Sequence, residues 1–394
     1  MNRLSGHTYR LFIFLFAFLL FLTGCDQSPE VEESSRSGAS ETSVAFVYKE
    51  EIADYNWSHL HELGRQYVVE NVSDIETKYV EGVAIEDAEQ VIRDLADEGH
   101  KLIFATAPEF SDTVLLVAKD FPDTFFEVAQ GSETADNVGT YDGRMYQMFY
   151  MVGRFAAEMT LSGVIGFVAP EPTVEVIRHI NAIALSALSH RPCEDVTVQV
   201  RWTGSWNDPE ADRTAALDLV EAGADILVQH TYSPEVQKVA EEKGVRSVGY
   251  GFDMREFAPT AITTSIIWQW GWYYERQVNA LLEGEWEAEA YFGKASTKNF
   301  GRGIIDLAPF DYEQIPTIIA AMAMRLRVQY NETNRDALDG PINAQNGDLV
   351  LAKGDKFDQD YLLNEMDWFV VGVVGEAPGE PPEAVEGIGA LINC

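Results

Sequence analysis

Cysteine and positive charge are both scarce in this sequence. Only three cysteines occur among 394 residues, and none has the close partner that a thiolate metal site requires. This scarcity excludes a disulfide-rich scaffold and a cysteine-ligated metal. An oxidising compartment would permit Cys193 and Cys394 to pair, but their spacing does not require it.

Lys and Arg total 28 against 64 Asp and Glu, which leaves a formal net charge of −36. A surface this acidic repels phosphate backbones and anionic lipid headgroups, so we expect no nucleic-acid partner. We interpret the acidity as a solubility feature of the kind that salty surroundings favour.

The common catalytic motifs are absent as well. The sequence has no G-x-S-x-G elbow, no H-E-x-x-H, no Walker loop and no G-x-G-x-x-G. The "GYG" at 249–251 lacks the third glycine of a dinucleotide-binding loop. Glu241 and Glu242, which are neighbours in the sequence, fall on a predicted solvated helix face. We therefore expect no enzymatic activity, no cofactor and no metal.

The amino-terminal apolar run, Leu11 to Leu22, has 12 residues and is too short to span a bilayer. Two arginines and no acid precede it, which predicts a secretory signal peptide over 1–24. The run ends in "LTGC", similar to a bacterial lipobox, so Cys25 is the expected site of lipidation; an ordinary signal with a chance cysteine is the alternative. Residues 25–42 have almost no apolar content and predict a disordered tether.

The body of the chain alternates short apolar segments with helical patterns. The predicted strands are 43–48, 77–83, 101–106, 124–130, 163–169, 196–202, 224–230, 246–251 and 261–267. The predicted helices are 57–70, 86–98, 144–160, 174–189, 211–222, 234–243 and 269–283. This alternation is typical of an α/β protein with parallel sheets flanked by helices, and about 350 residues exceed one comfortable core, so we expect two lobes.

Ligands of open α/β sheets bind outside the carboxyl ends of the strands. Those ends are rich in Tyr, Trp, Asp and His in this sequence; they are the segments 48–57, 106–109, 141–144, 170–172, 203–208, 230–233 and 251–255. Two lobes that present such edges to each other would form an aromatic cleft.

A series of strings in a fixed order resembles a known family. The strings are "DYNWSHLHELGR", "GHKLIFAT", "FPDTFFEVA", "TADNVGTYDGR", "GSWNDP", "GADILVQH" and "FAPTAITTSIIWQWGWYY". Together they are similar to the basic membrane lipoproteins, the purine-binding receptors of ABC importers, from about Val44 to Val371. The resemblance implies a two-lobed periplasmic binding protein of type I, with 43–142 and 259–285 in lobe 1 and 143–258 and 286–371 in lobe 2. Residues 372–394 form an acidic, Pro- and Gly-rich tail that departs from the family.

Family members are similar in holding a purine ring between two aromatic side chains, one from each lobe. By position, the resemblance assigns these roles to Trp57 and Trp206. Stacking a base on an aromatic ring is worth roughly 1–3 kcal/mol. The alternatives are that Trp57 packs on the core side of its helix and that Trp206 anchors a loop.

Three departures from the nucleoside-binding members favour a free nucleobase over a nucleoside. Ser58 stands where those members have an Asn that reads the base edge. Tyr48 stands where they have an acid, and Trp268 where they have a Lys that reaches the sugar. Bulky aromatic side chains would fill the volume that a sugar needs.

Five further residues complete the predicted ligand site. Asp253 matches an acid that contacts ligand in the family, and a carboxylate suits purine N–H donors and a ribose diol equally. Asp54 is expected to cap the helix, and direct contact with ligand is the alternative. His61 lies one turn beyond Trp57 on the same helix face. His230 lies in the cleft or packs a loop, and Tyr141 lines the cleft or braces the hinge.

The resemblance implies a lipid-anchored, monomeric receptor at the cell membrane, facing the periplasm. It would capture a purine-type nucleobase or nucleoside and deliver it to an inner-membrane ABC permease. Two alternatives stay open: a binding protein for another small solute, and a ligand-sensing lipoprotein without transport.

Overall fold

The computed structural model describes residues 42–191, 195–294, 303–310, 315–333 and 335–386. The predicted signal peptide, Cys25 and the tether up to residue 41 lie outside the described residues. Cys193 and Cys394 lie outside them too.

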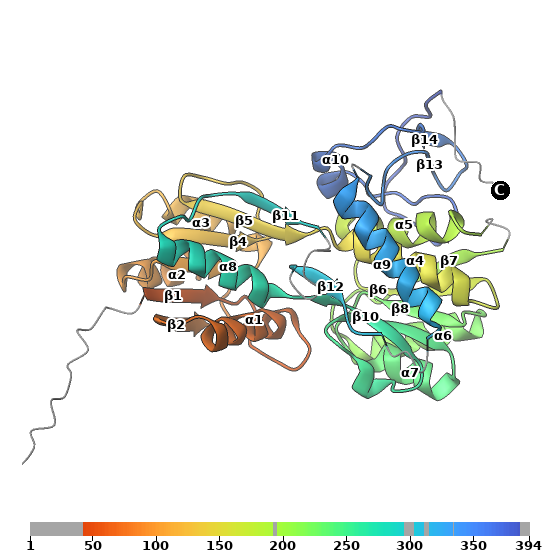
Figure 1. The fold of residues 1–394 in the computed structure, drawn as a ribbon, viewed down its shortest axis with the longest axis horizontal. Helices are drawn as coiled ribbons and strands as arrows, with labels where there is room; N and C mark the ends of the chain where they lie inside the picture. The colour runs from red at the N-terminus through yellow and green to blue at the C-terminus, as the bar shows by residue number, and fades with distance from the viewer. Residues whose placement is uncertain (1–41, 192–194, 295–302, 311–314, 334, 387–394) are drawn as a thin grey trace, which may run out of the picture. The chain divides into compact units, whose positions relative to one another are not determined.

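The first sheet contains six strands in the order β11-β5-β4-β3-β1-β2, and every neighbouring pair is parallel (Figure 1). Its strands are β1 (Thr42–Val47), β2 (Ile75–Val80), β3 (Leu102–Ala105), β4 (Phe125–Ala129), β5 (Val138–Gly143) and β11 (Ala290–Gly293). On one face pack α1 (Trp57–Asn71) and α8 (Trp270–Glu283). On the other pack α2 (Ala88–Asp97) and α3 (Ser111–Val117), which follows the short 3₁₀ helix Pro108–Phe110. We call this sheet and its helices the first lobe.

The second sheet has seven strands in the order β12-β10-β9-β8-β6-β7-β15, parallel except where β12 pairs with β10. Its strands are β6 (Val164–Ala169), β7 (Thr197–Trp202), β8 (Ile226–Gln229), β9 (Arg246–Gly251), β10 (Ile262–Trp268), β12 (Ile305–Leu307) and β15 (Val373–Val374). One face is covered by α4 (Met145–Met159) and α5 (Val174–Leu188), the other by α6 (Pro209–Glu221) and α7 (Glu235–Lys243). A second 3₁₀ helix, Arg255–Phe257, follows β9. This sheet and its helices form the second lobe.

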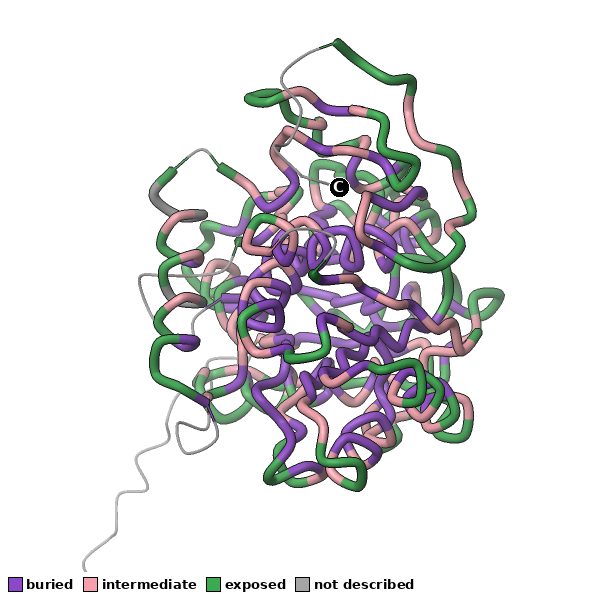
Figure 2. The backbone as a smooth tube through the Cα atoms, turned by 90° about the vertical axis from the view of Figure 1, so that its right-hand side faces the viewer, coloured by how far each residue is buried: buried purple, intermediate pink, exposed green. Residues whose placement is uncertain are grey.

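Both sheets share one winding pattern. In each, the first strand of the lobe lies between the second and the third, and the following strands extend the sheet in chain order, except that β15 is added beside β7 at the other edge of the second sheet. Two parallel sheets flanked by helices confirm the predicted fold class. Buried residues follow the strands of both sheets, and exposed residues gather on loops and outer helix faces (Figure 2).

The structure differs from the expected lobe boundaries at two strands. β10 was expected in the first lobe, but it pairs with β9 of the second sheet. β11 was expected in the second lobe, but it pairs with β5 of the first. The chain therefore crosses between the sheets after β5, after β10 and again between β11 and β12. The local sequence of a strand next to a crossing does not show to which of the two sheets that strand belongs.

The carboxyl-terminal segment packs on the second lobe. It contains α9 (Thr317–Glu332), the two-stranded sheet β13 (Ile342–Asn343) and β14 (Leu349–Leu351), and α10 (Gln359–Asn364). Asn181 of α5 holds it with both ends of its amide: Nδ2 donates to the Trp368 carbonyl at 2.8 Å, and Oδ1 accepts from the Val370 N–H at 3.0 Å. The start of the predicted tail is β15, an edge strand on β7. Residues 387–394 of that tail lie outside the described residues.

Among the described residues, no helix combines the length and the apolar composition that crossing a bilayer requires.

Candidate functional site

The first candidate, Trp57, is held at the start of α1 by the cap of that helix. Asn56 is the N-cap: its side chain accepts a hydrogen bond from the His59 N–H at 2.9 Å. The expectation that Asp54 caps this helix is therefore wrong, because Asp54 lies two residues too early and its side chain is exposed. The Trp57 indole N–H donates to the Thr106 carbonyl at 2.6 Å, which fixes the ring at the carboxyl end of β3.

Three indoles meet beside this point. Trp268, at the end of β10, stacks on Trp270 with a centroid distance of 4.3 Å and an interplanar angle of 9°. Trp57 stands edge-on to both, at 5.9 Å from Trp268 and 5.3 Å from Trp270. The Trp268 indole N–H donates to the Tyr250 hydroxyl at 3.0 Å, which holds this ring on the second sheet, while its stacking on Trp270 of α8 connects it to the first lobe.

Trp206, in the loop after β7, comes from the second lobe. Its ring packs on Tyr232 at 6.1 Å and 29°, and Tyr232 lies 6.5 Å from Trp57 at 49°. The two candidate indoles thus come from opposite sheets and share one aromatic neighbour. A planar guest between two parallel rings needs faces about 7 Å apart, twice the usual carbon contact distance.

Each of the two indoles also has an imidazole standing edge-on to it. His61 lies 4.6 Å from Trp57 at 78°, and His230 lies 5.3 Å from Trp206 at 86°. Within the described residues, Nε2 of His61 and both ring nitrogens of His230 are buried without a hydrogen-bond partner. Burial holds the pKa of His61 well below its usual value and lowers that of His230 to about 3, so both rings are neutral.

The remaining first-lobe candidates have partners inside their own lobe. The Tyr48 hydroxyl donates to Glu62 at 2.9 Å, and the Tyr141 and Tyr274 hydroxyls lie 3.0 Å apart. Nδ1 of His61 lies 2.5 Å from the same Tyr274 hydroxyl. Ser58 is buried and accepts from the Glu50 N–H at 3.2 Å.

Asp253 lies in the loop after β9 and pairs with Arg255, whose guanidinium spans both carboxylate oxygens at 2.5 to 3.0 Å. Together with Trp268 it lines a pocket of about 380 Å³. Leu60 and Gly64 of α1 form another wall of this pocket. Asp253 thus lies at the junction of the lobes, with its charge already compensated.

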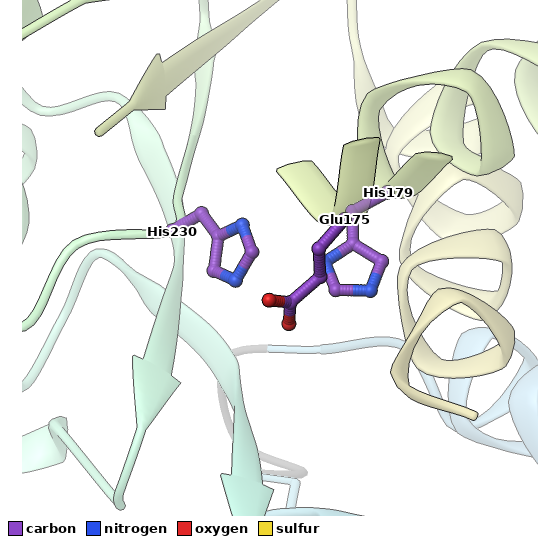
Figure 3. Close-up of side chains that lie close together, drawn as sticks. All are labelled: Glu175, His179 and His230. Carbon is purple, nitrogen blue, oxygen red and sulfur yellow. The ribbon is translucent and has the colours of Figure 1, made fainter. Parts of the chain in front are cut away.

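Sequence reasoning missed two residues beside His230. Glu175 and His179 lie one turn apart at the start of α5, and the ligand atoms of all three side chains lie within 4.8 Å of one another. Figure 3 shows the Glu175 carboxylate between the two imidazoles. The E-x-x-x-H spacing after a strand end was the available signal, since residues i and i+4 share a helix face.

A buried acid next to this group, Asp142 of β5, was also missed. Burial, followed by the charge of Glu175, raises the pKa of Asp142 to about 7. Burial likewise raises the pKa of Glu175, and Gln130 donates hydrogen bonds to both carboxyls. Because Asp142 and Gln130 belong to the first sheet and Glu175 to α5, these contacts connect the two lobes.

Two lobes of parallel sheet, connected by several crossings and with aromatic and polar side chains at the facing strand ends, define a solute-binding protein. A family model described as ABC transporter substrate-binding protein PnrA-like (Bmp) matches residues 41–309. The chain belongs to this family.

Two relatives cover most of the chain. It is 35% identical over 337 residues to a purine-binding protein from Brucella abortus (strain 2308), covering 85% of this chain and 93% of that protein. It is 36% identical over 352 residues to TsgA13 from Haloferax volcanii, named as a candidate ABC transporter glucose-binding protein, covering 89% of this chain and 85% of that one.

Solved structures agree on the fold. A transcriptional activator of the comK gene from Bacillus halodurans superposes with a TM-score of 0.65 at 21% identity, covering 74% of this chain and 98% of that one. An ABC transporter solute-binding protein from Conexibacter woesei gives 0.61 at 18% identity, covering 75% and 99%.

Proposed function

We propose that this protein is a lipid-anchored, extracytoplasmic receptor that captures a purine-type nucleobase and delivers it to an ABC permease. One observation carries the proposal. Trp57 and Trp206 come from opposite sheets, share Tyr232 as a neighbour, and each stands beside an imidazole with an unpartnered nitrogen. The name of the 35% identical relative from Brucella abortus supports a purine as the ligand.

Capture takes place in two steps in this proposal. The base first stacks on one indole while the lobes are apart, and the second indole then covers its other face as they close. Each stacked ring contributes roughly 1–3 kcal/mol. Polar edges of the base meet the neutral imidazoles: His230 can donate and accept one hydrogen bond, whereas His61 offers only Nε2, because its Nδ1 bonds the Tyr274 hydroxyl. A wrong base leaves a buried group without a partner, at a cost of roughly 1–3 kcal/mol.

The surroundings of the indoles favour a nucleobase over a nucleoside. Trp268 is buried and stacked where a sugar-binding side chain would be needed. Tyr48 donates its hydroxyl to Glu62, so it has no proton left for a ribose oxygen.

Isothermal titration calorimetry with adenine, guanine, hypoxanthine, xanthine and adenosine tests this function. We expect at least one base to bind more tightly than adenosine. Failure of all five compounds to bind would reject a purine ligand.

A sugar is the second candidate, because the 36% identical Haloferax volcanii relative is named for glucose. Indole faces also stack on sugar rings, so the aromatic cluster alone does not separate the two. Glucose belongs in the same titration series. Binding of glucose without binding of any base would replace the purine assignment.

Lipidation at Cys25 and transport have their own tests. Intact mass spectrometry of the membrane-extracted chain should show an acyl mass that is lost in Cys25→Ser. Genes for a permease and an ATPase beside this one would support import, and their absence would favour a ligand-sensing lipoprotein.

A further inference from the structure

Glu175, His179 and His230 form a group of potential metal ligands, and only His230 among them also takes part in the proposed purine capture. Glu175 and His179 are supplied by consecutive turns of α5, and His230 follows the end of β8. Both elements lie in the second lobe, so the group exists whether or not the lobes close. One potential ligand atom from each side chain lies within 4.8 Å of the others (Figure 3).

The two histidines lack the hydrogen bonds that buried imidazoles normally have. Within the described residues, all four ring nitrogens of His179 and His230 are buried without a partner. Buried polar atoms are nearly always satisfied, so such a pair requires an explanation, and an unoccupied metal site is one of the few available. Neutral imidazole is also the form that binds metals.

Apolar rings hold the two imidazoles in place. Phe149 stacks on His179 at 4.6 Å and 20°, and Tyr250 stands edge-on to His230 at 4.3 Å and 77°. The imidazole centroids themselves lie 4.8 Å apart. These walls keep the rings facing each other, which preorganises two nitrogen ligands.

The local charge suits a cation. Asp142 and Glu175 supply two partly buried carboxyl groups beside the imidazoles. The nearby cation, Arg178, donates Nη1 to the Leu362 carbonyl and lies over the Tyr146 ring. Its positive charge also acts on the two carboxyls and both imidazoles, so a bound metal ion would share the two acids with one guanidinium. Buried carboxylates are normally paired or bound to metal.

We propose that Glu175, His179 and His230 bind one divalent transition-metal ion, with zinc the best match. Two imidazoles and one carboxylate form a known zinc ligand set, which leaves a fourth position for water or a small ligand. Zinc bonds of about 2.0–2.2 Å place the ligand atoms roughly 3.3 Å apart, so small side-chain rotations complete the site. Calcium and magnesium are disfavoured because they prefer oxygen ligands throughout.

Equilibrium dialysis of the metal-free chain against zinc chloride tests the site, with Cys193 and Cys394 replaced by Ser to remove thiol binding. We expect one tightly bound zinc per chain. His179→Leu and His230→Leu should each weaken it by at least about 100-fold, equivalent to about 2.7 kcal/mol. Cobalt in place of zinc should give visible absorption bands typical of tetrahedral coordination, and these should vanish in both variants.

His190→Leu is the matched control, because His190 is a partly exposed imidazole beside Glu158. It should leave zinc affinity unchanged. Zinc binding that survives both buried-histidine substitutions, or that only His190→Leu removes, would overturn the proposal. Glu175→Gln keeps the test decisive if a histidine variant unfolds, because it changes a half-buried side chain by one atom and should still weaken binding.

The metal inference and the purine proposal share His230, so their tests are kept separate. Dialysis is performed without base, and base titration is performed on metal-free protein. Zinc binding without base binding would retain the metal site alone, and the opposite result would retain the purine site alone.

Discussion

The carboxyl ends of the two sheets occupy equivalent positions in the fold but differ in how their polar groups are satisfied. In the first lobe, Tyr48, Ser58 and Tyr141 all have hydrogen-bond partners in the same lobe. In the second, His179 and His230 have none within the described part of the chain. Apart from Nε2 of His61, the candidates of the first edge are therefore satisfied within their own lobe, whereas, among the described residues, two imidazoles of the second edge have both ring nitrogens free to bond.

The path of the chain explains this difference. After β10 the chain returns to the first lobe as α8, and Trp270, Tyr273 and Tyr274 of that helix pack against strand residues such as Phe46. Tyr274 supplies its hydroxyl to both His61 and Tyr141. The second lobe receives its additional carboxyl-terminal segment mainly on α5 and the β7 edge, away from the end of β8.

The largest expected effect concerns Glu127 of β4, a first-lobe side chain whose two carboxyl oxygens each accept a hydrogen bond. Burial raises its pKa from 4.5 to about 8, although Tyr273 and Trp286 donate hydrogen bonds to it. The unfolded carboxyl loses its proton near pH 4.5 and the folded one near pH 8. Folding stability should therefore fall as pH rises between these values, by up to about 1.4 kcal/mol per pH unit.

Glu127→Gln should remove this loss, because an amide does not ionise. The difference in unfolding free energy between variant and parent should grow by on the order of 4 kcal/mol from pH 4.5 to pH 8. Urea unfolding at several pH values measures it, with the exposed Glu133→Gln as control. Parallel profiles for parent and Glu127→Gln would contradict the assignment.

The second prediction compares partnered and unpartnered side chains directly. Tyr48→Phe removes a hydrogen bond to the Glu62 carboxylate and should destabilise the fold by roughly 1.5–3 kcal/mol. His179→Leu removes two buried nitrogens without partners, so stability in metal-free buffer should stay the same or rise. Thermal unfolding measures both, and a larger loss for His179→Leu than for Tyr48→Phe would reverse the comparison.

The third prediction concerns stacking by the second lobe. Trp206→Ala should lower base affinity by roughly 1–3 kcal/mol, or about 5- to 150-fold. Trp202→Ala is the control, because that indole stacks on Phe369 and donates to the Glu376 carbonyl instead. Calorimetry with the tightest-binding base measures both, and equal losses would remove Trp206 from the proposed site.

The smallest expected effect is at Tyr55, a first-lobe residue that stacks on Phe252 of the second lobe at 4.7 Å and 16°. Its φ of 65° is unusual for a non-glycine residue and directs the side chain across the junction. Tyr55→Ala should remove an aromatic pair worth roughly 0.5–1.5 kcal/mol and weaken base binding about 2- to 13-fold. Tyr55→Phe keeps the ring and should bind as the parent does; an unchanged affinity in Tyr55→Ala would show that this pair does not aid closure.

Local patterns predicted most helices and strands, because a hydrophobic period that continues over a long segment is recognisable in the sequence. The patterns at 57–70 and 174–189 correspond to α1 and α5 within one residue at each end. β5 was missed because Val138–Gly143 contains two glycines and an aspartate in place of an apolar run. α3 was missed because its seven residues span barely two turns.

The candidate site was predicted less completely. The resemblance named Trp57 and Trp206, and helix spacing and strand-end position named His61 and His230; their roles in ligand binding stay predictions. The polar atoms of Tyr48 and Ser58, which were also named, already have protein partners. Glu175, His179 and Asp142 were overlooked because none stands out in its own segment. Their chemistry arises from contact among three separate elements.

The sequence by itself determined the alternating α/β architecture, the acidic surface and the family, because these depend on periodicity, composition and ordered motifs. Only the tertiary structure decided which polar side chains are satisfied and which are left with bonding capacity. The physical reason is that a side chain becomes buried or hydrogen-bonded only through contact with residues that other parts of the chain supply. The hydroxyls of Tyr141 and Tyr274 are hydrogen-bonded although 133 residues separate them in the chain, and no local pattern predicts that contact.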